Sequence, residues 1–179
     1  MRNVTLEDLE KNKDKMDAVT YNRGLHGVSE DKRTLEAAEV LVKGDFKRFG
    51  ELMNASHDSL RDLFEVSCPE VDELVEIARK TKGVYGSRIT GGGFGGCTVT
   101  LIEKDAIQSL KDAVNVNYLH ASLNKQYLGK LFEDSYILRR TRFRWSEDSL
   151  ILQFYLLIII LCLMIPLNDI QIISSSCNF

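Results

Sequence analysis

The residues of this chain that could do chemistry gather in one glycine-rich segment, Gly91-Gly92-Gly93-Phe94-Gly95-Gly96. Glycine loses more backbone entropy on folding than any other residue, so five glycines in six positions need a local reason. One reason is that glycine-rich backbone lets N–H groups approach an anion such as phosphate. The other is a tight connection that packs against another segment of backbone. The spacing alone leaves both interpretations open.

The surroundings of the segment argue against three nucleotide-binding motifs. Gly91, Gly93 and Gly96 have the spacing of a dinucleotide-binding fingerprint, but we expect a strand after Gly96, where that motif requires a helix. A Walker A loop would continue with Lys and Ser or Thr, whereas here Cys97 and Thr98 follow. A protein-kinase glycine loop would precede Val-Ala-Ile-Lys and His-Arg-Asp elements, and the sequence has neither.

Outside this segment, Arg88 and His57 are the residues whose type could serve a reaction. Arg88 is a candidate for a positive charge near phosphate, the alternative being a solvated or paired arginine. His57 could act as a general base, but we interpret a single histidine on a helix as a structural or surface residue. The cysteines lack the CxxC spacing of a zinc site and are too few and too widely spaced for a disulfide framework; they are Cys68, Cys97, Cys162 and Cys177.

The elements that position the glycine segment are two predicted strands. Residues 84–90 and 97–102 flank the segment, and the second stretch alternates apolar and polar side chains. A helix is expected from Lys104 to about Tyr118. This order predicts an α+β fold, with helices packed on a small, mainly antiparallel sheet.

Four helices are predicted upstream of the strands. Thr5 can cap the first, Leu25-His26-Gly27 is expected to end it, and Ser29 can cap a second helix that buries Leu35, Ala38 and Val42. The third carries a narrow apolar stripe, and Ser67 and Glu70 have the spacing of a capping box for the fourth. The expected ranges are residues 6–21, 30–43, 46–63 and 69–81.

Composition narrows the class of protein. The chain has 179 residues, 44% of them hydrophobic and 27% charged, which is typical of a globular domain. A net charge of −3 gives no electrostatic case for a nucleic-acid partner. The N-terminus is charged from Arg2 and has no apolar core of a signal peptide, so we expect a cytoplasmic protein.

The run Ser87 to Val99 resembles the third, C-terminal signature motif of the GHMP small-molecule kinases, in the form typical of galactokinases. Further segments resemble successive galactokinase segments, so that the likeness covers roughly residues 2–117. These segments are Val4–Glu7, His26–Glu30, Ser56–Asp62 and Val66–Glu70. Phe64 stands where a tyrosine is common in the family. The expected fold is therefore a GHMP kinase C-terminal-type domain.

The resemblance implies ATP-dependent phosphorylation of the C1 hydroxyl of galactose, with Mg²⁺. In the family the catalytic residues, the sugar-binding acidic residues and the main phosphate loop precede the segment seen here, so we expect no catalytic residue and no metal ligand in this chain. The missing N-terminal half would have to come in cis or in trans. The resemblance implies that the glycine segment supports the phosphate loop. The residues expected to do so are Gly91, Gly92, Gly93, Gly95 and Gly96, with Arg88.

The last third of the chain departs from the family. Residues 118–148 are charged and divergent, and residues 149–179 form an apolar tail whose only charge is Asp169. Because residues 150–165 are apolar except for Gln153, a short membrane helix is one interpretation, and arginines precede it. We expect residues 118–179 to stay outside the kinase-like domain and to leave an unpaired sheet edge.

Three functions therefore remain open. The favoured one is the C-terminal part of a galactokinase, inactive by itself. The alternatives are a non-catalytic, sugar-sensing or regulatory relative, and a fragment anchored in a membrane by its tail.

Overall fold

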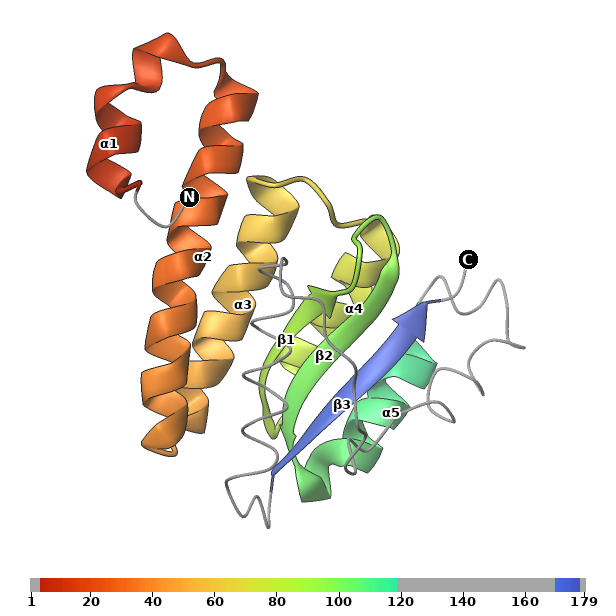
Figure 1. Cartoon of the computed structure of the whole chain (residues 1–179). Coiled ribbons are helices and arrows are strands. Elements are labelled where there is room, and N and C mark those ends of the chain that lie inside the picture. The colour runs from red at the N-terminus through yellow and green to blue at the C-terminus, as the bar shows by residue number, and fades with distance from the viewer. Residues whose placement is uncertain (1–3, 119–169, 178–179) are drawn as a thin grey trace, which may run out of the picture.

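The computed structural model describes residues 4–118 and 170–177, which form a layered α+β structure (Figure 1). The helices of this part are α1 (Leu6–Lys11), α2 (Ala18–Val42), α3 (Phe46–Asp62), α4 (Pro69–Lys80) and α5 (Ile107–Asn117), with the short 3-10 helices η1 (Lys13–Lys15) and η2 (Lys104–Ala106). The strands are β1 (Val84–Thr90), β2 (Gly96–Glu103) and β3 (Ile170–Cys177).

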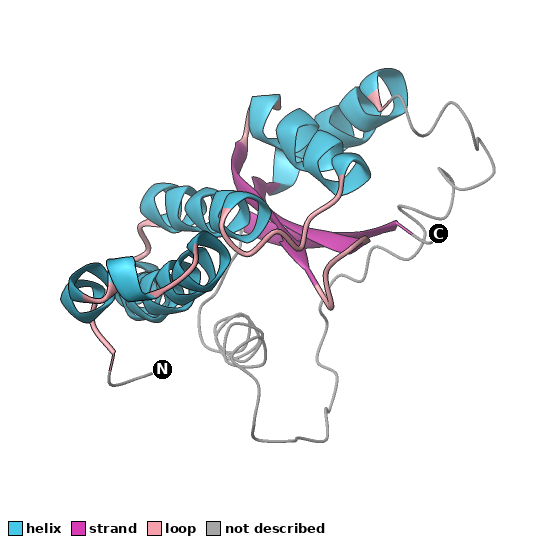
Figure 2. Ribbon diagram, turned by 90° about the horizontal axis from the view of Figure 1, so that it is seen from above, coloured by secondary structure: helices cyan, strands magenta, loops and turns pink. Residues whose placement is uncertain are grey.

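The three strands form one antiparallel sheet in the order β1-β2-β3. Helices α4 and α5 cover one face, where Ile102 is fully buried against both helices (Figure 2). Val99 and Leu101 project from the opposite face of β2 and pack in the core formed by α2 and α3. The predicted fold class, helices on a small antiparallel sheet, is confirmed.

The predicted helices and strands from Phe46 onward are confirmed, but the N-terminal prediction is wrong in two places. The first helix ends at Lys11, and a new helix begins after Asp17, whose side chain accepts a hydrogen bond from the Thr20 amide. Helix α2 then continues through Leu25-His26-Gly27 to Val42 without a break. Burial of this helix on its neighbours outweighs the modest helix penalty of glycine, about 1 kcal/mol.

Two further local expectations are corrected. Leu35 and Val42 of α2, which were predicted to be buried, are exposed, while Ala37 and Leu41 are buried, so the buried face is rotated from the predicted one. The N-cap of α4 is Cys68, without a side-chain capping bond. The predicted Ser67–Glu70 capping box does not form, because the Ser67 hydroxyl donates to Asp72 instead.

The outer edge of β2 is occupied by β3, so the expectation of an unpaired edge at this position is wrong. Ile170–Cys177 pairs with β2 along its whole length, from Glu103 opposite Ile170 to Gly96 opposite Cys177. Ile172 packs against the core formed by α2, α3 and β2. The end of the chain therefore contributes a strand to the domain, although its composition differs from that of the residues before it.

The proposed membrane segment, residues 150–165, lies outside the described residues. Within the part of the chain that the structure describes, every helix is too short or too polar to cross a bilayer.

Candidate functional site

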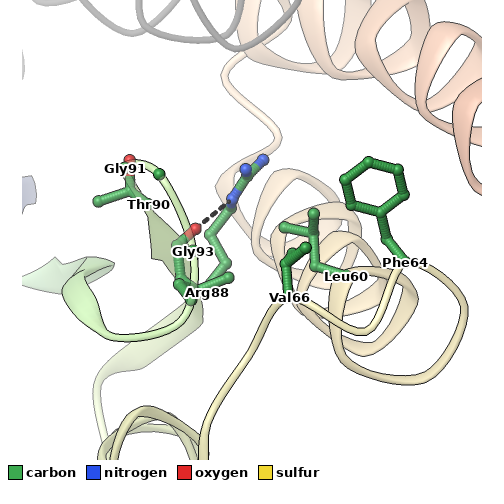
Figure 3. Close-up of a pocket in the computed structure, with 9 residues that line it drawn as sticks. Leu60, Phe64, Val66, Arg88, Thr90, Gly91 and Gly93 are labelled. Atoms are coloured by element: carbon green, nitrogen blue, oxygen red, sulfur yellow. Dashed lines mark hydrogen bonds between the residues drawn. The ribbon is translucent and has the colours of Figure 1, made fainter.

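A small pocket lies where β1 leads into the glycine segment (Figure 3). Its volume is about 70 Å³. One wall is apolar and comes from the end of α3 and the residues after it, and the other wall is backbone of the glycine turn. The lining residues are Leu60, Phe64, Val66, Arg88, Ile89, Thr90, Gly91, Gly92 and Gly93. The structure thus brings together Arg88 and three of the five glycines predicted as site residues.

Residues 91–95 form a turn between β1 and β2 in which positive φ angles predominate. Gly91, Gly93, Gly95 and Gly96 have φ between 83° and 128°, a region that L side chains rarely adopt. Phe94 also has a positive φ, 58°, and its ring is exposed. A strand follows Gly96, which confirms the argument against a dinucleotide-binding turn.

The turn is fixed to the loop between α3 and α4. The Phe94 amide donates a 2.7 Å hydrogen bond to the Val66 carbonyl oxygen. At Gly93 the approach is close enough that a Cβ atom would lie 2.9 Å from the same oxygen. Gly91 and Gly92, by contrast, have open space where a Cβ would be. One glycine of the turn thus packs tightly against backbone, as one of the two interpretations expects, and two have open space around them.

Arg88 lies in β1 with only 9% of its surface exposed. Its Nε atom donates a 3.0 Å hydrogen bond to the Ile89 carbonyl oxygen, and its guanidinium extends between the glycine turn and the side chains of Leu60 and Phe64 (Figure 3). Arg88 is therefore a buried cation at the pocket and not a solvated one.

His26 lies next to Phe64, one of the residues that line the pocket, and close to three arginines. His26 of α2 stacks on Phe64, with ring centroids 4.7 Å apart, and its Nδ1 atom lies 2.8 Å from the Ser59 hydroxyl. Burial lowers the pKa of His26 to about 4, and the charges of three arginines lower it further in the same direction; they are Arg33, Arg88 and Arg23. Two of these arginines are ion-paired, Arg23 with Glu65 and Arg33 with Glu30.

Helix α3 holds the outer edge of β1. The Ser87 amide donates to Asn54 Oδ1 at 2.9 Å, and the Ile89 amide donates to His57 Nδ1 at 3.2 Å. Side chains of the helix thus satisfy strand N–H groups that would otherwise be left at a sheet edge. Sequence periodicity indicated that α3 packs on another element, but it could not show that Asn54 accepts strand hydrogen bonds.

His57 is completely buried, so it is a core residue and is not available as a surface base. Its Nε2 atom lies 3.2 Å from Asp72 Oδ1 of α4, without a well-aligned hydrogen bond. Burial lowers the pKa of His57 to about 4, the charge of Arg79 lowers it further, and Asp72 opposes the shift. The ring is therefore neutral at pH 7.

The described residues bring together no group of three or more His, Cys, Asp or Glu side chains that could hold a metal ion.

The comparisons with known proteins agree with this fold. Residues 37–120 match the family described as GHMP kinases C terminal. The chain is 52% identical to a galactokinase of Bos taurus over 118 residues, which cover 66% of this chain and 30% of that protein. It is 56% identical to a galactokinase of Homo sapiens over 106 residues, covering 59% of this chain and 27% of that one.

A solved structure is also similar. The crystal structure of Lactococcus lactis galactokinase complexed with galactose superposes with a TM-score of 0.63 at 40% identity, over 66% of this chain and 31% of that one. The chain thus spans about 30% of the length of the relatives that it matches. Residues 37–120 therefore carry a GHMP kinase C-terminal domain, and the N-terminal two thirds of the chain are similar to the matching part of galactokinases.

Proposed function

We propose that this chain supplies the C-terminal part of a galactokinase, the part that supports the phosphates of ATP while galactose is phosphorylated at its C1 hydroxyl. The observation that carries the proposal is the glycine turn. It is fixed at one end by Val66, presents open backbone at Gly91 and Gly92, and lies beside the buried cation Arg88. Phosphoryl transfer depends on such fixed donors and positive charges around the transferred group.

The same proposal predicts that the chain is inactive by itself. The similarity covers only about 30% of the length of the relatives. Loss of the remaining binding and catalytic groups removes the electrostatic terms that supply most of the acceleration. The missing part would be supplied in cis by a longer product or in trans by a partner chain.

The experiment is complementation. The chain is co-expressed with the N-terminal part of bovine galactokinase that precedes the matching residues, and galactose-dependent ADP release is measured. We expect turnover only when both parts are present. Turnover by the chain alone, on the order of 1 per second as in ordinary kinases, would contradict the inactivity. Absence of activity from a stable complex of the two parts would contradict the catalytic assignment.

A matched pair of variants tests the glycine turn in this assay. Gly93→Ala introduces a methyl group 2.9 Å from the Val66 oxygen, whereas Gly92→Ala places it in open space. We expect the first to reduce complemented activity at least tenfold and the second to retain most of it.

We also propose a cytoplasmic location, and fractionation of cells expressing the full chain would show whether residues 150–165 direct it to membranes instead.

A further inference from the structure

We propose that His57 is a positioning residue for the glycine turn, because it holds the backbone of Ile89 at the point where β1 leads into the turn. Ile89 is two residues before Gly91, and its N–H donates to His57 Nδ1 at 3.2 Å. The consequence for phosphate binding rests on the proposed function, but the positioning itself does not.

The hydrogen bond requires one protonation state of the ring. Nδ1 can accept from Ile89 only when it carries no proton, so the single proton of the neutral ring is on Nε2. Nε2 faces Asp72 Oδ1 at 3.2 Å, where the carboxylate favours that tautomer. Ser67 donates to the same carboxylate and fixes its orientation. One buried side chain thus links α3, α4 and β1.

Both polar backbone groups of Ile89 are engaged in this arrangement. Its amide bonds to His57, and its carbonyl oxygen accepts the hydrogen bond from Arg88 Nε. A displacement of the Ile89 peptide would therefore move the guanidinium of Arg88 as well as the start of the turn.

The turn has a second attachment at its other end, the bond from the Phe94 amide to the Val66 oxygen. A Cβ at Gly91 or Gly92, which lie between the two attachments, would meet no atom within 4 Å. No neighbouring segment therefore packs against these two glycines on the side where a Cβ would be. Their backbone is held from the flanking residues, through the bonds of Ile89 and Phe94 and the pairing of Thr90 with Cys97.

The test is amide hydrogen exchange of the full chain, measured residue by residue. His57→Leu fills the space without an acceptor, and His57→Asn retains an acceptor near the position of Nδ1. His26→Asn is the matched control, because His26 is also buried but bonds to Ser59 and not to β1. The measured quantity is the exchange rate of Ile89 relative to that of Leu101, a buried residue of β2 that reports general destabilisation.

We expect His57→Leu to raise this ratio about tenfold, the effect of losing one net hydrogen bond. His57→Asn should restore it to within about threefold of the original chain, and His26→Asn should leave it unchanged. An unchanged ratio in His57→Leu, or an equal increase in all three variants, would show that the ring only fills space and would overturn the proposal.

A measurement on the unaltered chain keeps the proposal testable if His57→Leu fails to fold. The ¹⁵N chemical shifts of the His57 ring at pH 7 should report a neutral imidazole with its proton on Nε2. A proton on Nδ1 would overturn the proposal. Because neither experiment uses nucleotide, sugar or a partner chain, its outcome is independent of whether complementation succeeds.

Discussion

Gly50 of α3 and Gly86 of β1 are in backbone-to-backbone contact. A Cβ atom on Gly50 would lie 2.1 Å from the Tyr85 carbonyl oxygen, and one on Gly86 would lie 2.3 Å from the Gly50 carbonyl oxygen. This close approach brings α3 near enough to β1 for Asn54 and His57, one and two turns further along the helix, to reach the strand amides. The two glycines thus determine how the helix supports the strand that leads into the site.

The first prediction follows from this contact. Gly50→Ala should lower the free energy of unfolding by about 2–3 kcal/mol, because the rigid backbone of Tyr85 cannot yield. Alanine is otherwise the better helix former by about 1 kcal/mol, so a loss is opposite to what propensity alone predicts. Gly24→Ala in α2 is the control, since its Cβ would meet only the flexible end of Leu9. Urea denaturation of both variants measures the difference. Equal stability of the two would contradict the role of the Gly50–Gly86 contact.

The second prediction concerns acid. The folded-state pKa values of His26 and His57 are lowered to about 4, below the ordinary value of 6.5. Between these values the unfolded chain binds protons that the folded chain does not, so stability is full above pH 6.5 and is lost as the pH falls towards 4. The loss should reach roughly 2–3 kcal/mol for each histidine.

Denaturant titrations at several pH values check this prediction. The double variant with His26→Asn and His57→Asn should show a much flatter dependence between pH 6.5 and 4. Three aspartates have pKa values below 3.8 in the folded chain, namely Asp8, Asp17 and Asp62. Their contributions to stability are lost below the pH range of the histidines and so do not affect this comparison. A double variant with the original acid sensitivity would mean that other groups cause it.

Sequence patterns predicted the elements whose signals are local. The amphipathic stripe of α3, the proline near the start of α4 and the alternation of β2 all correspond to observed elements. The glycine turn and Arg88 can be predicted from the sequence because they are close to each other along the chain as well as in the pocket. The fold class follows from the order of the predicted helices and strands, and the family resemblance from the run Ser87 to Val99 together with segments spread over roughly residues 2–117.

The patterns failed where distant parts of the chain decide the outcome. Gly27 predicts a helix end, yet the packing of α2 on its neighbours keeps this residue helical. Asn54 and Asp72 carry no signal of their own, because their roles depend on which strand and histidine they meet. The pairing of Ile170–Cys177 with β2 could not be read from composition, which describes a segment but not its partner.

The third prediction tests that pairing. Deleting residues 170–179 removes a strand from the edge of β2 and should lower the denaturation midpoint, because it leaves β2 amides and carbonyls without their partner. A point variant separates packing from pairing. Ile172→Ser should cost about 1–2 kcal/mol, since Ile172 is partly buried against the core of α2, α3 and β2. Val116→Ser, at a valine that is 82% exposed, is the control and should change little. Unchanged stability after the deletion would contradict a structural role of β3.

The fourth prediction separates strain from contact in the glycine turn. Alanine at Gly92 meets no atom within 4 Å and no positive φ, so stability should stay within about 0.5 kcal/mol of the original chain. Alanine at Gly91 also has open space but must adopt a φ of +104°, which should cost about 1 kcal/mol of backbone strain. Alanine at Gly93 combines a φ of +83° with a contact of 2.9 Å to the Val66 oxygen, and should cost about 2–3 kcal/mol. Thermal and urea denaturation of the three variants should give this order. Should Gly92→Ala prove the most damaging, the attachment of Gly93 and Phe94 to Val66 could not be what holds the turn.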